Sequence, residues 1–146
     1  MSELPHITVA TVIPDGDQFL LVRENSDGEL VYNQPAGHVE LGETILQAAV
    51  RETLEETAWH VELQSFLGVY QHKAESNGIT YMRHCFIAQA IRCDESRNLD
   101  PDIDEALWLT KNEIKDLQDK LRSPMVWRAI EDYESGDCYP LSLFRP

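Results

Sequence analysis

Apolar runs separated by turn residues dominate the first quarter of the chain. Residues 7–13 (ITVATVI) are all β-branched or apolar, which predicts a strand buried on both faces. After a turn at residues 14–17, the segment 19–22 (FLLV) predicts the returning strand of a hairpin. A second turn at residues 25–28 precedes a short predicted strand at 30–32. We therefore expect this part of the chain to form hairpins.

The pattern then changes to that of an amphipathic helix. Residues 33–42 (NQPAGHVELG) contain Pro35 and Gly37 and predict a loop. Thr44 is a favourable N-cap, and Gln47 three residues later completes a capping box. The helix is predicted to run from residue 45 to about residue 57.

A helical wheel at 100° per residue divides this helix into two broad faces. The predicted core face consists of Leu46, Val50, Thr53, Leu54 and Thr57. Roughly opposite lie three glutamates together with small or apolar residues: Glu52, Glu55, Glu56, Ile45, Ala48 and Ala49. Because the neighbours of the glutamates are not hydrophilic, we expect the carboxylates to be partly enclosed.

The second half of the chain also mixes strands with helices. Strand-rich stretches at residues 61–70 and 79–90 are joined by a segment that ends in Asn77-Gly78, a strong hairpin signal. An acidic loop at residues 92–104 precedes a short predicted strand at 106–109.

Two further helices are predicted after this strand. Thr110 and Glu113 form a second capping box, for a helix to about residue 121. Ser123-Pro124 begins another helix, which should end near Gly136. The order of elements favours an α/β (α+β) sandwich with a mixed sheet.

Composition narrows the class of protein. The chain has 146 residues, which suits a single domain over residues 1–146. Its net charge of −14 argues against binding to nucleic acid or an anionic membrane, but a bound metal would still permit a small phosphorylated substrate. No signal peptide or membrane span is evident, and the sparse cysteines predict reduced thiols and a cytoplasmic location: Cys85, Cys93 and Cys138.

The glutamates of the central helix indicate a metal site. Glu52, Glu55 and Glu56 are spaced at i, i+3 and i+4, so a helix places them on one face. Their mutual repulsion costs roughly 0.2–0.5 kcal/mol per pair in an isolated helix. A divalent cation bound between the glutamates would make their clustering stabilising instead of destabilising.

Residues 37–59 resemble the signature of the Nudix hydrolase family, G-x5-E-x7-R-E-U-x-E-E-x-G-U, in which U is a bulky apolar residue. Six positions match at the family's spacing: Gly37, Glu43, Arg51, Glu52, Glu55 and Glu56. Thr53 departs from the first U position and Ala58 replaces the last glycine, whereas Trp59 fits the final U. The segments YNQPAGHVE and LRSPMVWRAIEDYESGDCYPL resemble the NudJ-type branch of the family.

The resemblance implies a Nudix-type α/β/α sandwich and a Mg²⁺ site, with Mn²⁺ as a possible substitute. Glu52, Glu56, Glu55 and the carbonyl of Gly37 are then the expected metal ligands, and Glu52 also has a catalytic role. Glu55 is the candidate general base, although acidic residues of the downstream loop are alternatives: Asp102, Asp104 and Glu105.

Arg51 is expected to orient the glutamates by pairing with Glu55 at i+4, or with Glu43 if the loop folds back. Glu43 could equally serve the helix N-terminus through the helix dipole. Ala58 should either keep the left-handed conformation of the family's glycine, at a cost of roughly 1 kcal/mol, or shift the helix end.

The sequence specifies the substrate less closely than the metal site. The branch implies hydrolysis of nucleoside tri- or diphosphates or of a related thiamine-precursor pyrimidine pyrophosphate. The alternatives are a catalytically silent nucleotide-binding module and a hydrolase of ADP-ribose or sugar-nucleotide substrates. A monomer is the preferred state, and six side chains could contact the substrate, although each is more readily explained by a structural role: Arg23, Tyr32, Gln34, Tyr81, Arg83 and Trp127.

Overall fold

Two four-stranded sheets form the centre of the protein. The computed structural model describes residues 4–145. The first sheet has the order β5 (Ala36–His38), β1 (His6–Val12), β7 (Thr80–Cys93) and β6 (Trp59–Lys73). The β1–β7 pair is parallel and the other two pairs are antiparallel, so the predicted mixed sheet is confirmed here.

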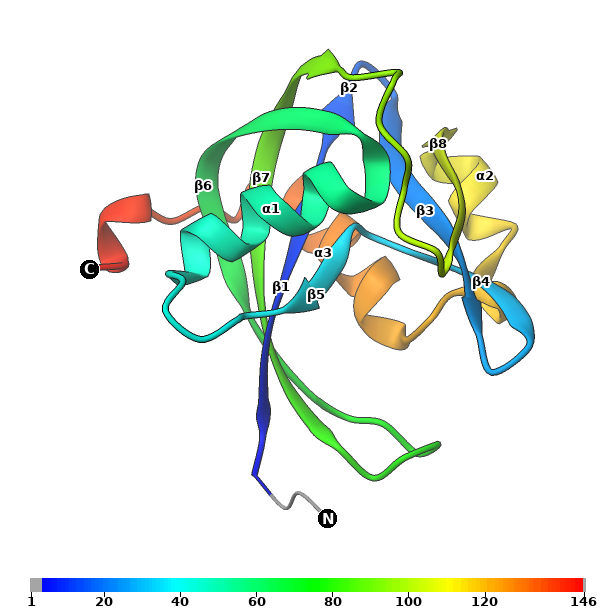
Figure 1. Cartoon of the computed structure of the whole chain (residues 1–146), viewed down its shortest axis with the longest axis horizontal. Helices are drawn as coiled ribbons and strands as arrows, with labels where there is room; N and C mark the ends of the chain where they lie inside the picture. Colours follow the sequence, from blue (N-terminus) through cyan, green and yellow to red (C-terminus); the bar gives the residue numbers. More distant parts are fainter. Residues whose placement is uncertain (1–3, 146) are drawn as a thin grey trace.

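The second sheet is antiparallel throughout its described pairs. It contains β2 (Pro14–Asp15), β3 (Gln18–Ser26) and β4 (Glu29–Asn33), and β8 (Ile103–Thr110) pairs with β3. Strand β8 follows β7 directly in the described chain but pairs with β3, so it closes the second sheet from far along the sequence (Figure 1).

The helices begin where their caps were predicted. Helix α1 (Ile45–Thr57) has the complete capping box of Thr44 and Gln47. Helix α3 (Pro124–Glu134) starts after Ser123, whose side chain accepts a hydrogen bond from the Met125 amide. Both sets of bounds agree closely with the prediction from sequence.

The helix predicted to reach residue 121 is shorter. Helix α2 (Lys111–Lys115) keeps its capping box, but its hydrogen bonding then changes to the tighter 3₁₀ pattern, and η1 (Gln118–Lys120) follows. The amides of Leu117 and Lys120 each bond to the carbonyl three residues back, which ends the α-helix early.

The predicted loop at residues 33–42 contains a short strand. Ala36–His38 pairs with β1 as strand β5. This segment has proline and glycine and no alternation of apolar residues, so its strand character comes from the free edge of β1 and not from local propensity. The consequence is that Gly37 lies in a sheet, beside α1.

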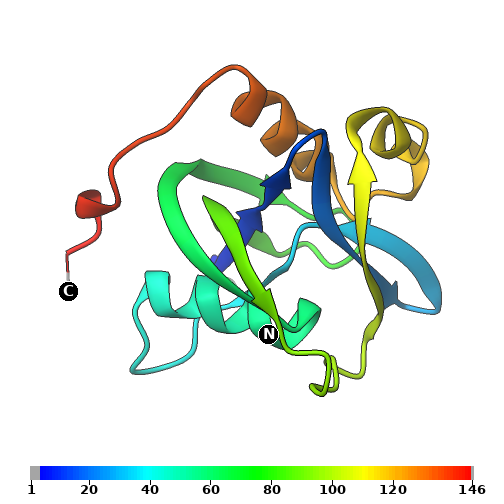
Figure 2. The ribbon, with the colours of Figure 1, turned by 90° about the horizontal axis from the view of Figure 1, so that it is seen from above.

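Layers on both faces enclose the first sheet. Helix α1 covers one face, where Ala48 and Ala49 pack with Val9, Phe66 and Phe86. Helix α3 and the second sheet cover the other face, whose cluster includes Ala10 and Cys85 (Figure 2). Short 3₁₀ helix η2 (Leu141–Leu143) follows beyond Tyr139, which pairs with Phe66 at the edge of β6.

The buried face of α1 differs in part from the predicted one. Thr53 and Thr57 are buried as expected, but the other buried residues are Ala48, Ala49 and Glu56, while Leu46, Val50 and Leu54 are half-buried. Small alanines allow the helix backbone to lie close to the sheet, and this close packing rotates the leucines toward the rim. Among residues 4–145, no helix is long and apolar enough to cross a membrane.

Ala58 retains the left-handed conformation. Its φ is 64° and its amide donates to the Leu54 carbonyl at 2.9 Å, so the helix end has not shifted. Ala58→Gly should therefore raise the free energy of unfolding by about 0.5–1 kcal/mol, because glycine adopts this conformation without the Cβ clash. Urea unfolding measures the change.

Ala48→Gly is the matched control for that experiment. Ala48 is buried within α1, so glycine there should lower the free energy of unfolding by about 1 kcal/mol. Equal destabilisation by both substitutions would contradict the strain assigned to Ala58.

Candidate active site

Helix α1 and strand β5 meet through two carboxylates. Glu56 is 8% exposed, and its Oε1 accepts a hydrogen bond from the Ala36 amide at 2.9 Å. Glu52 lies against Gly37 so closely that a Cβ built on Gly37 would fall 1.5 Å from Glu52 Oε2. Gly37 is thus required for the close approach of a carboxylate to the sheet.

The edge of β5 presents alternate backbone groups to α1. The bonds Thr11 N–Pro35 O and Val39 N–Ile7 O flank the Val9–Gly37 pair, so the antiparallel pattern directs the polar groups of Gly37 toward β1. The groups of Ala36 and His38 point outward instead, which the contacts of Ala36 N and His38 O with α1 side chains demonstrate. The Ala36 carbonyl, and not the Gly37 carbonyl implied by the resemblance, is therefore the candidate backbone ligand for a metal.

Arg51 organises the remaining acidic side chains. Its Nη1 donates to Glu52 Oε1 at 2.7 Å and to Glu55 Oε1 at 2.9 Å. Its Nε and Nη2 both donate to Glu43 at 2.7 Å. Glu55 and Glu43, the two alternative partners expected for Arg51 from the sequence, therefore bind it at the same time. The Arg51 guanidinium lowers the pKa of Glu43 to about 2, which keeps this anchor ionised.

Burial shifts the pKa values of Glu52 and Glu56, the two glutamates that lie against β5. Burial raises the pKa of Glu56 to about 9, and the charges of Glu24 and Glu52 act in the same direction. Burial also raises the pKa of Glu52 to about 7, against the opposing effect of Arg51. Carboxylates that resist ionisation when alone are stabilised as anions by a cation. This donor set fits a divalent metal.

The carboxylates do not yet converge on a single point. Within residues 4–145, no three His, Cys, Asp or Glu side chains are arranged to hold a metal ion. Arg51 Nη1 contacts Oε1 of both Glu52 and Glu55. Oε2 of each carboxylate is therefore left as a donor for a metal while Arg51 holds the other oxygen.

The downstream acidic loop contributes a residue that the sequence did not single out. Asp104 and Glu105 bind Arg23, with Asp104 Oδ2 2.7 Å from Nε. Asp102 is exposed. Asp100 instead lies beside α1, where its amide donates to the Glu55 carbonyl at 3.0 Å. Burial and then the charge of Glu55 raise the pKa of Asp100.

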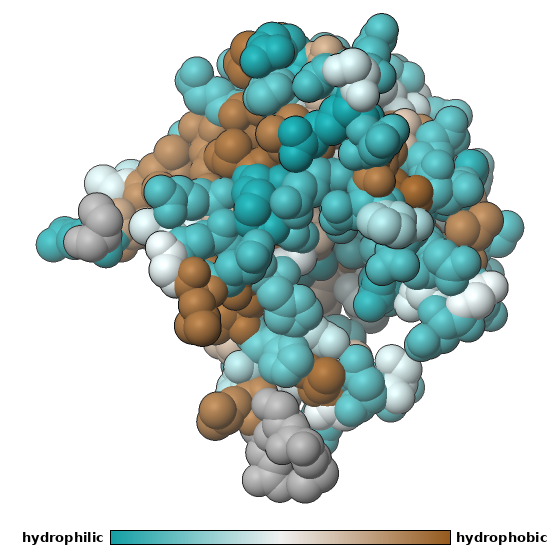
Figure 3. Space-filling view, in the orientation of Figure 1, coloured by the Kyte–Doolittle hydropathy of each residue, from teal (hydrophilic) through white to brown (hydrophobic). Residues whose placement is uncertain are grey.

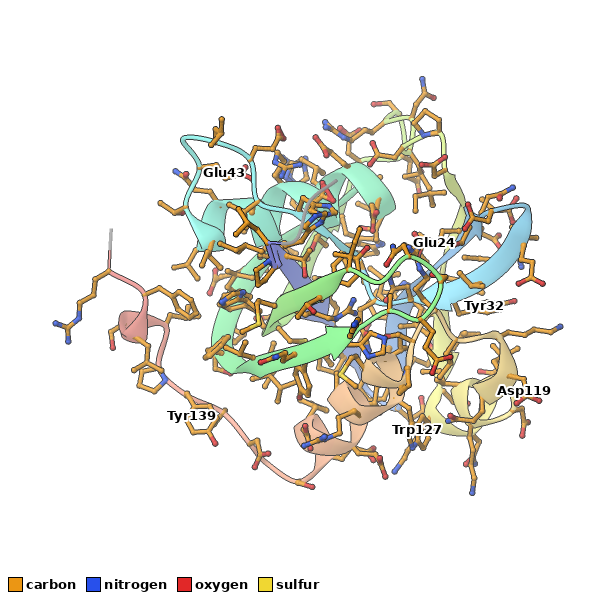
Figure 4. The ribbon with its side chains drawn as sticks, turned by 90° about the horizontal axis from the view of Figure 1, so that it is seen from below. Glu24, Tyr32, Glu43, Asp119, Trp127 and Tyr139 are labelled. Atoms are coloured by element: carbon orange, nitrogen blue, oxygen red, sulfur yellow. The ribbon has the colours of Figure 1, made fainter. Side chains whose placement is uncertain are left out.

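A pocket of about 270 Å³ opens on the other side of β5. Its lining comes from β1, β3–β5, the β6–β7 hairpin and the start of α3: Thr8, Glu24, Asn33, Ala36, Gly37, His38, His72, Ala74, Ser76, Asn77, Tyr81, Arg83, Arg122, Ser123 and Met125. Glu24 was also missed from sequence. Glu24, labelled in Figure 4, is buried. It accepts hydrogen bonds from Asn33 and Arg122. The available signal was that Glu24 falls in phase with Leu20 and Val22, which lie on the same side of a strand.

The six predicted substrate contacts separate into two groups. Tyr81 and Arg83 line the pocket, and buried Gln34 binds Arg83 Nη2 at 2.8 Å. Neither Gln34 nor the other three line the pocket. Arg23 pairs with the downstream loop, Tyr32 forms an isolated bridge with Leu121, and Trp127 packs against the core; Tyr32 and Trp127 are labelled in Figure 4. Hydrophilic residues cover much of α1 on the outer surface (Figure 3).

Comparison with known proteins gives a consistent assignment. Residues 4–128 match the family model described as "NUDIX domain". The chain is 37% identical over 139 residues to "Phosphatase NudJ" of Escherichia coli strain K12, covering 95% of this chain and 90% of that protein. It superposes on a solved "NUDIX hydrolase from Nitrosomonas europaea" with TM-score 0.96 and 42% identity, over 98% and 97% of the two chains.

A more distant structure shares the fold. The MutT protein from Methanosarcina mazei Go1 is 20% identical, with TM-score 0.73 over 93% of this chain and 99% of that one. The family match, the relatives and the glutamate-bearing helix agree in their functional implication. The chain belongs to the Nudix family and is a hydrolase that acts on phosphoanhydrides.

Proposed function

We propose that this enzyme hydrolyses phosphoanhydride bonds of nucleoside tri- or diphosphates, or of a related pyrimidine pyrophosphate, with Mg²⁺ as its metal and Mn²⁺ as a substitute. The enclosure of Glu52 and Glu56 against β5 carries this proposal. Two carboxylates with raised pKa values beside outward backbone groups are poorly explained by folding stability alone. They are well explained by a hard divalent cation, which prefers oxygen ligands.

Glu52, Glu56 and the Ala36 carbonyl would hold the metal, and Glu55 would serve either as a further ligand or as the general base. When bound, Mg²⁺ stabilises charge on the phosphate oxygens and lowers the pKa of water. Arg51 orients Glu52 and Glu55 through Nη1, while Glu43 anchors the other edge of its guanidinium. As general base, Glu55 would accept the proton of the attacking water, and Asp100 is the neighbouring alternative.

The size of the pocket bears on the competing substrates. Pockets for drug-sized ligands typically measure about 300–1,000 Å³. At about 270 Å³ the pocket favours one compact organic group over the two moieties of ADP-ribose or a sugar nucleotide. A silent binding module is disfavoured because binding alone gives no reason to keep three clustered glutamates.

The remaining expectations are part of the same proposal. The net charge of −14 favours a small phosphorylated substrate over nucleic acid or a membrane surface. A monomer in the cytoplasm remains a prediction from the sequence.

Metal removal tests the function directly. The protein is assayed with nucleoside tri- and diphosphates and a pyrimidine pyrophosphate, in Mg²⁺, in Mn²⁺ and in excess chelator. We expect release of phosphate or pyrophosphate with either metal and loss of more than about 100-fold in chelator. Identifying the product separates stepwise phosphate removal from pyrophosphate release. Absence of metal-dependent release from every substrate would contradict the proposal.

A further inference from the structure

Arg83 in β7 carries a guanidinium group whose hydrogen-bonding capacity is used in part. Nη2 donates to Asn33 Oδ1 at 3.0 Å and to Gln34 Oε1 at 2.8 Å. Nε is buried without a partner, and no other side-chain N or O atom of residues 4–145 is in that condition. Because an unsatisfied buried donor is costly, its presence indicates an acceptor from outside the described chain.

The two amides hold this guanidinium in a fixed orientation. Asn33 Nδ2 donates to Glu24 Oε1 at 3.1 Å, and Gln34 Nε2 donates to the Val126 carbonyl at 2.8 Å. Each amide therefore presents its oxygen to Arg83. Neutral amides do not neutralise a cation, and no salt bridge within residues 4–145 includes Arg83. A held, unneutralised guanidinium is suited to bind an oxygen acceptor.

Arg83 in β7 is separated by strand β1 from β5, the strand that lies beside the glutamates of α1. Thr8 pairs with His38 in β5 and with Arg83 in β7, so these three side chains form a row on one face. The neighbouring Val9–Gly37 pair faces α1, which places the row on the opposite face, in the pocket. A substrate with its phosphates at β5 would therefore extend its organic group toward Arg83.

We propose, on the basis of the proposed function, that Arg83 determines specificity by donating a hydrogen bond to an oxygen on the part of the substrate that is not hydrolysed. The pocket around it accepts a compact, single-ring group. The oxygen belongs either to a ring carbonyl or to a phosphate that stays with the organic group.

Variants of Arg83 test this assignment. Arg83→Met removes the donors at similar volume, and Arg83→Lys keeps a cation that recovers part of the binding. With uridine diphosphate as substrate we expect Arg83→Met to raise KM about 10- to 100-fold, with a smaller change in kcat. The thiamine-precursor pyrimidine pyrophosphate, a single ring without a carbonyl, distinguishes the two sources of oxygen. A ring carbonyl predicts an effect on the uridine compound alone, and a phosphate predicts equal effects on both.

A second pair of variants leaves Arg83 and its partners Asn33 and Gln34 unchanged. Ser76 is exposed and lines the pocket, whereas its exposed neighbour Glu75 does not line it. Ser76→Trp should raise KM by blocking the pocket, and Glu75→Trp should leave KM unchanged. This pair decides the location of the organic group even if Arg83→Met fails to fold.

A binding measurement separates this inference from the proposed function. Calorimetry with uridine monophosphate in excess chelator requires no turnover. We expect binding by the wild type, and weaker binding by Arg83→Met and Ser76→Trp. Wild-type turnover with unchanged KM and binding in these variants would overturn the role of Arg83 and retain the hydrolase. Absent turnover with Arg83-dependent binding would overturn the hydrolase proposal alone.

Discussion

Glu56→Gln should make the metal-free protein more stable while abolishing metal-dependent hydrolysis. Glu56 is 8% exposed and accepts the Ala36 amide, a bond that the Gln side-chain oxygen can also accept. Glutamine therefore keeps the packing and removes the cost of a buried charge. If Glu56 is a metal ligand, turnover should fall more than about 100-fold, because removing even residues that support metal ligands costs about 10–100-fold.

The raised pKa of Glu56 determines the pH range in which Glu56→Gln stabilises the folded protein. The pKa of Glu56 is about 9 in the folded protein, against an ordinary value of 4.5. Because the folded state binds this proton more tightly, the resulting stability is complete below pH 4.5 and is lost as pH rises toward 9. Glutamine does not titrate. Its advantage over the wild type should be near zero at pH 4.5 and reach a few kcal/mol at pH 8, or about 2–4 °C in Tm per kcal/mol.

Melting curves in chelator and in Mg²⁺ test both parts of the prediction. In chelator the variant should melt above the wild type at pH 8, and the difference should vanish toward pH 4.5. In Mg²⁺ the wild type should gain stability by mass action and the variant should gain much less. Glu55→Gln is the control, since Glu55 is 32% exposed and should give little stabilisation. A variant less stable than the wild type at pH 8 in chelator would contradict a costly Glu56 carboxylate.

Local signals in the sequence were sufficient to predict the helices that carry or flank the site. Helix α1 begins at a capping box and ends at a left-handed residue, both of which depend on a few neighbouring positions. Its core face was predicted less well because a helical wheel gives leucines more weight than alanines. In the protein, Ala48 and Ala49 lie against the sheet because their small size permits close packing.

Contacts between distant segments explain what the sequence did not reveal. Glu24 and Asp100 are far from α1 in the sequence but near it in the fold. Their charges contribute to raising the pKa of Glu56. Strand β5 exists because β1 offers an edge, and its pairing decides which backbone groups face α1. Such pairings depend on the register between strands, which a short segment with proline and glycine does not specify.

Gly37→Ala should remove most hydrolytic activity while leaving the fold intact. The added Cβ would lie 1.5 Å from Oε2 and 2.1 Å from Cδ of Glu52, so the carboxylate must move. The backbone at Gly37 does not have a positive φ, and alanine therefore introduces no backbone strain. If Glu52 holds the metal, we expect kcat to fall more than about 100-fold, equivalent to about 2.7 kcal/mol of transition-state stabilisation. Steady-state kinetics in saturating Mg²⁺ measures the loss.

Gly68→Ala provides a matched control within another strand of the same sheet. A Cβ at Gly68 has its nearest contact at 3.9 Å, with Tyr70 Cε2, so activity and Tm should remain close to those of the wild type. A double-mutant cycle identifies the route of the effect. Glu52→Gln alone should be nearly inactive, and adding Gly37→Ala to it should reduce kcat little further, because both changes act on one carboxylate. If the two losses multiplied instead, Gly37 would act on catalysis by a route other than the position of Glu52.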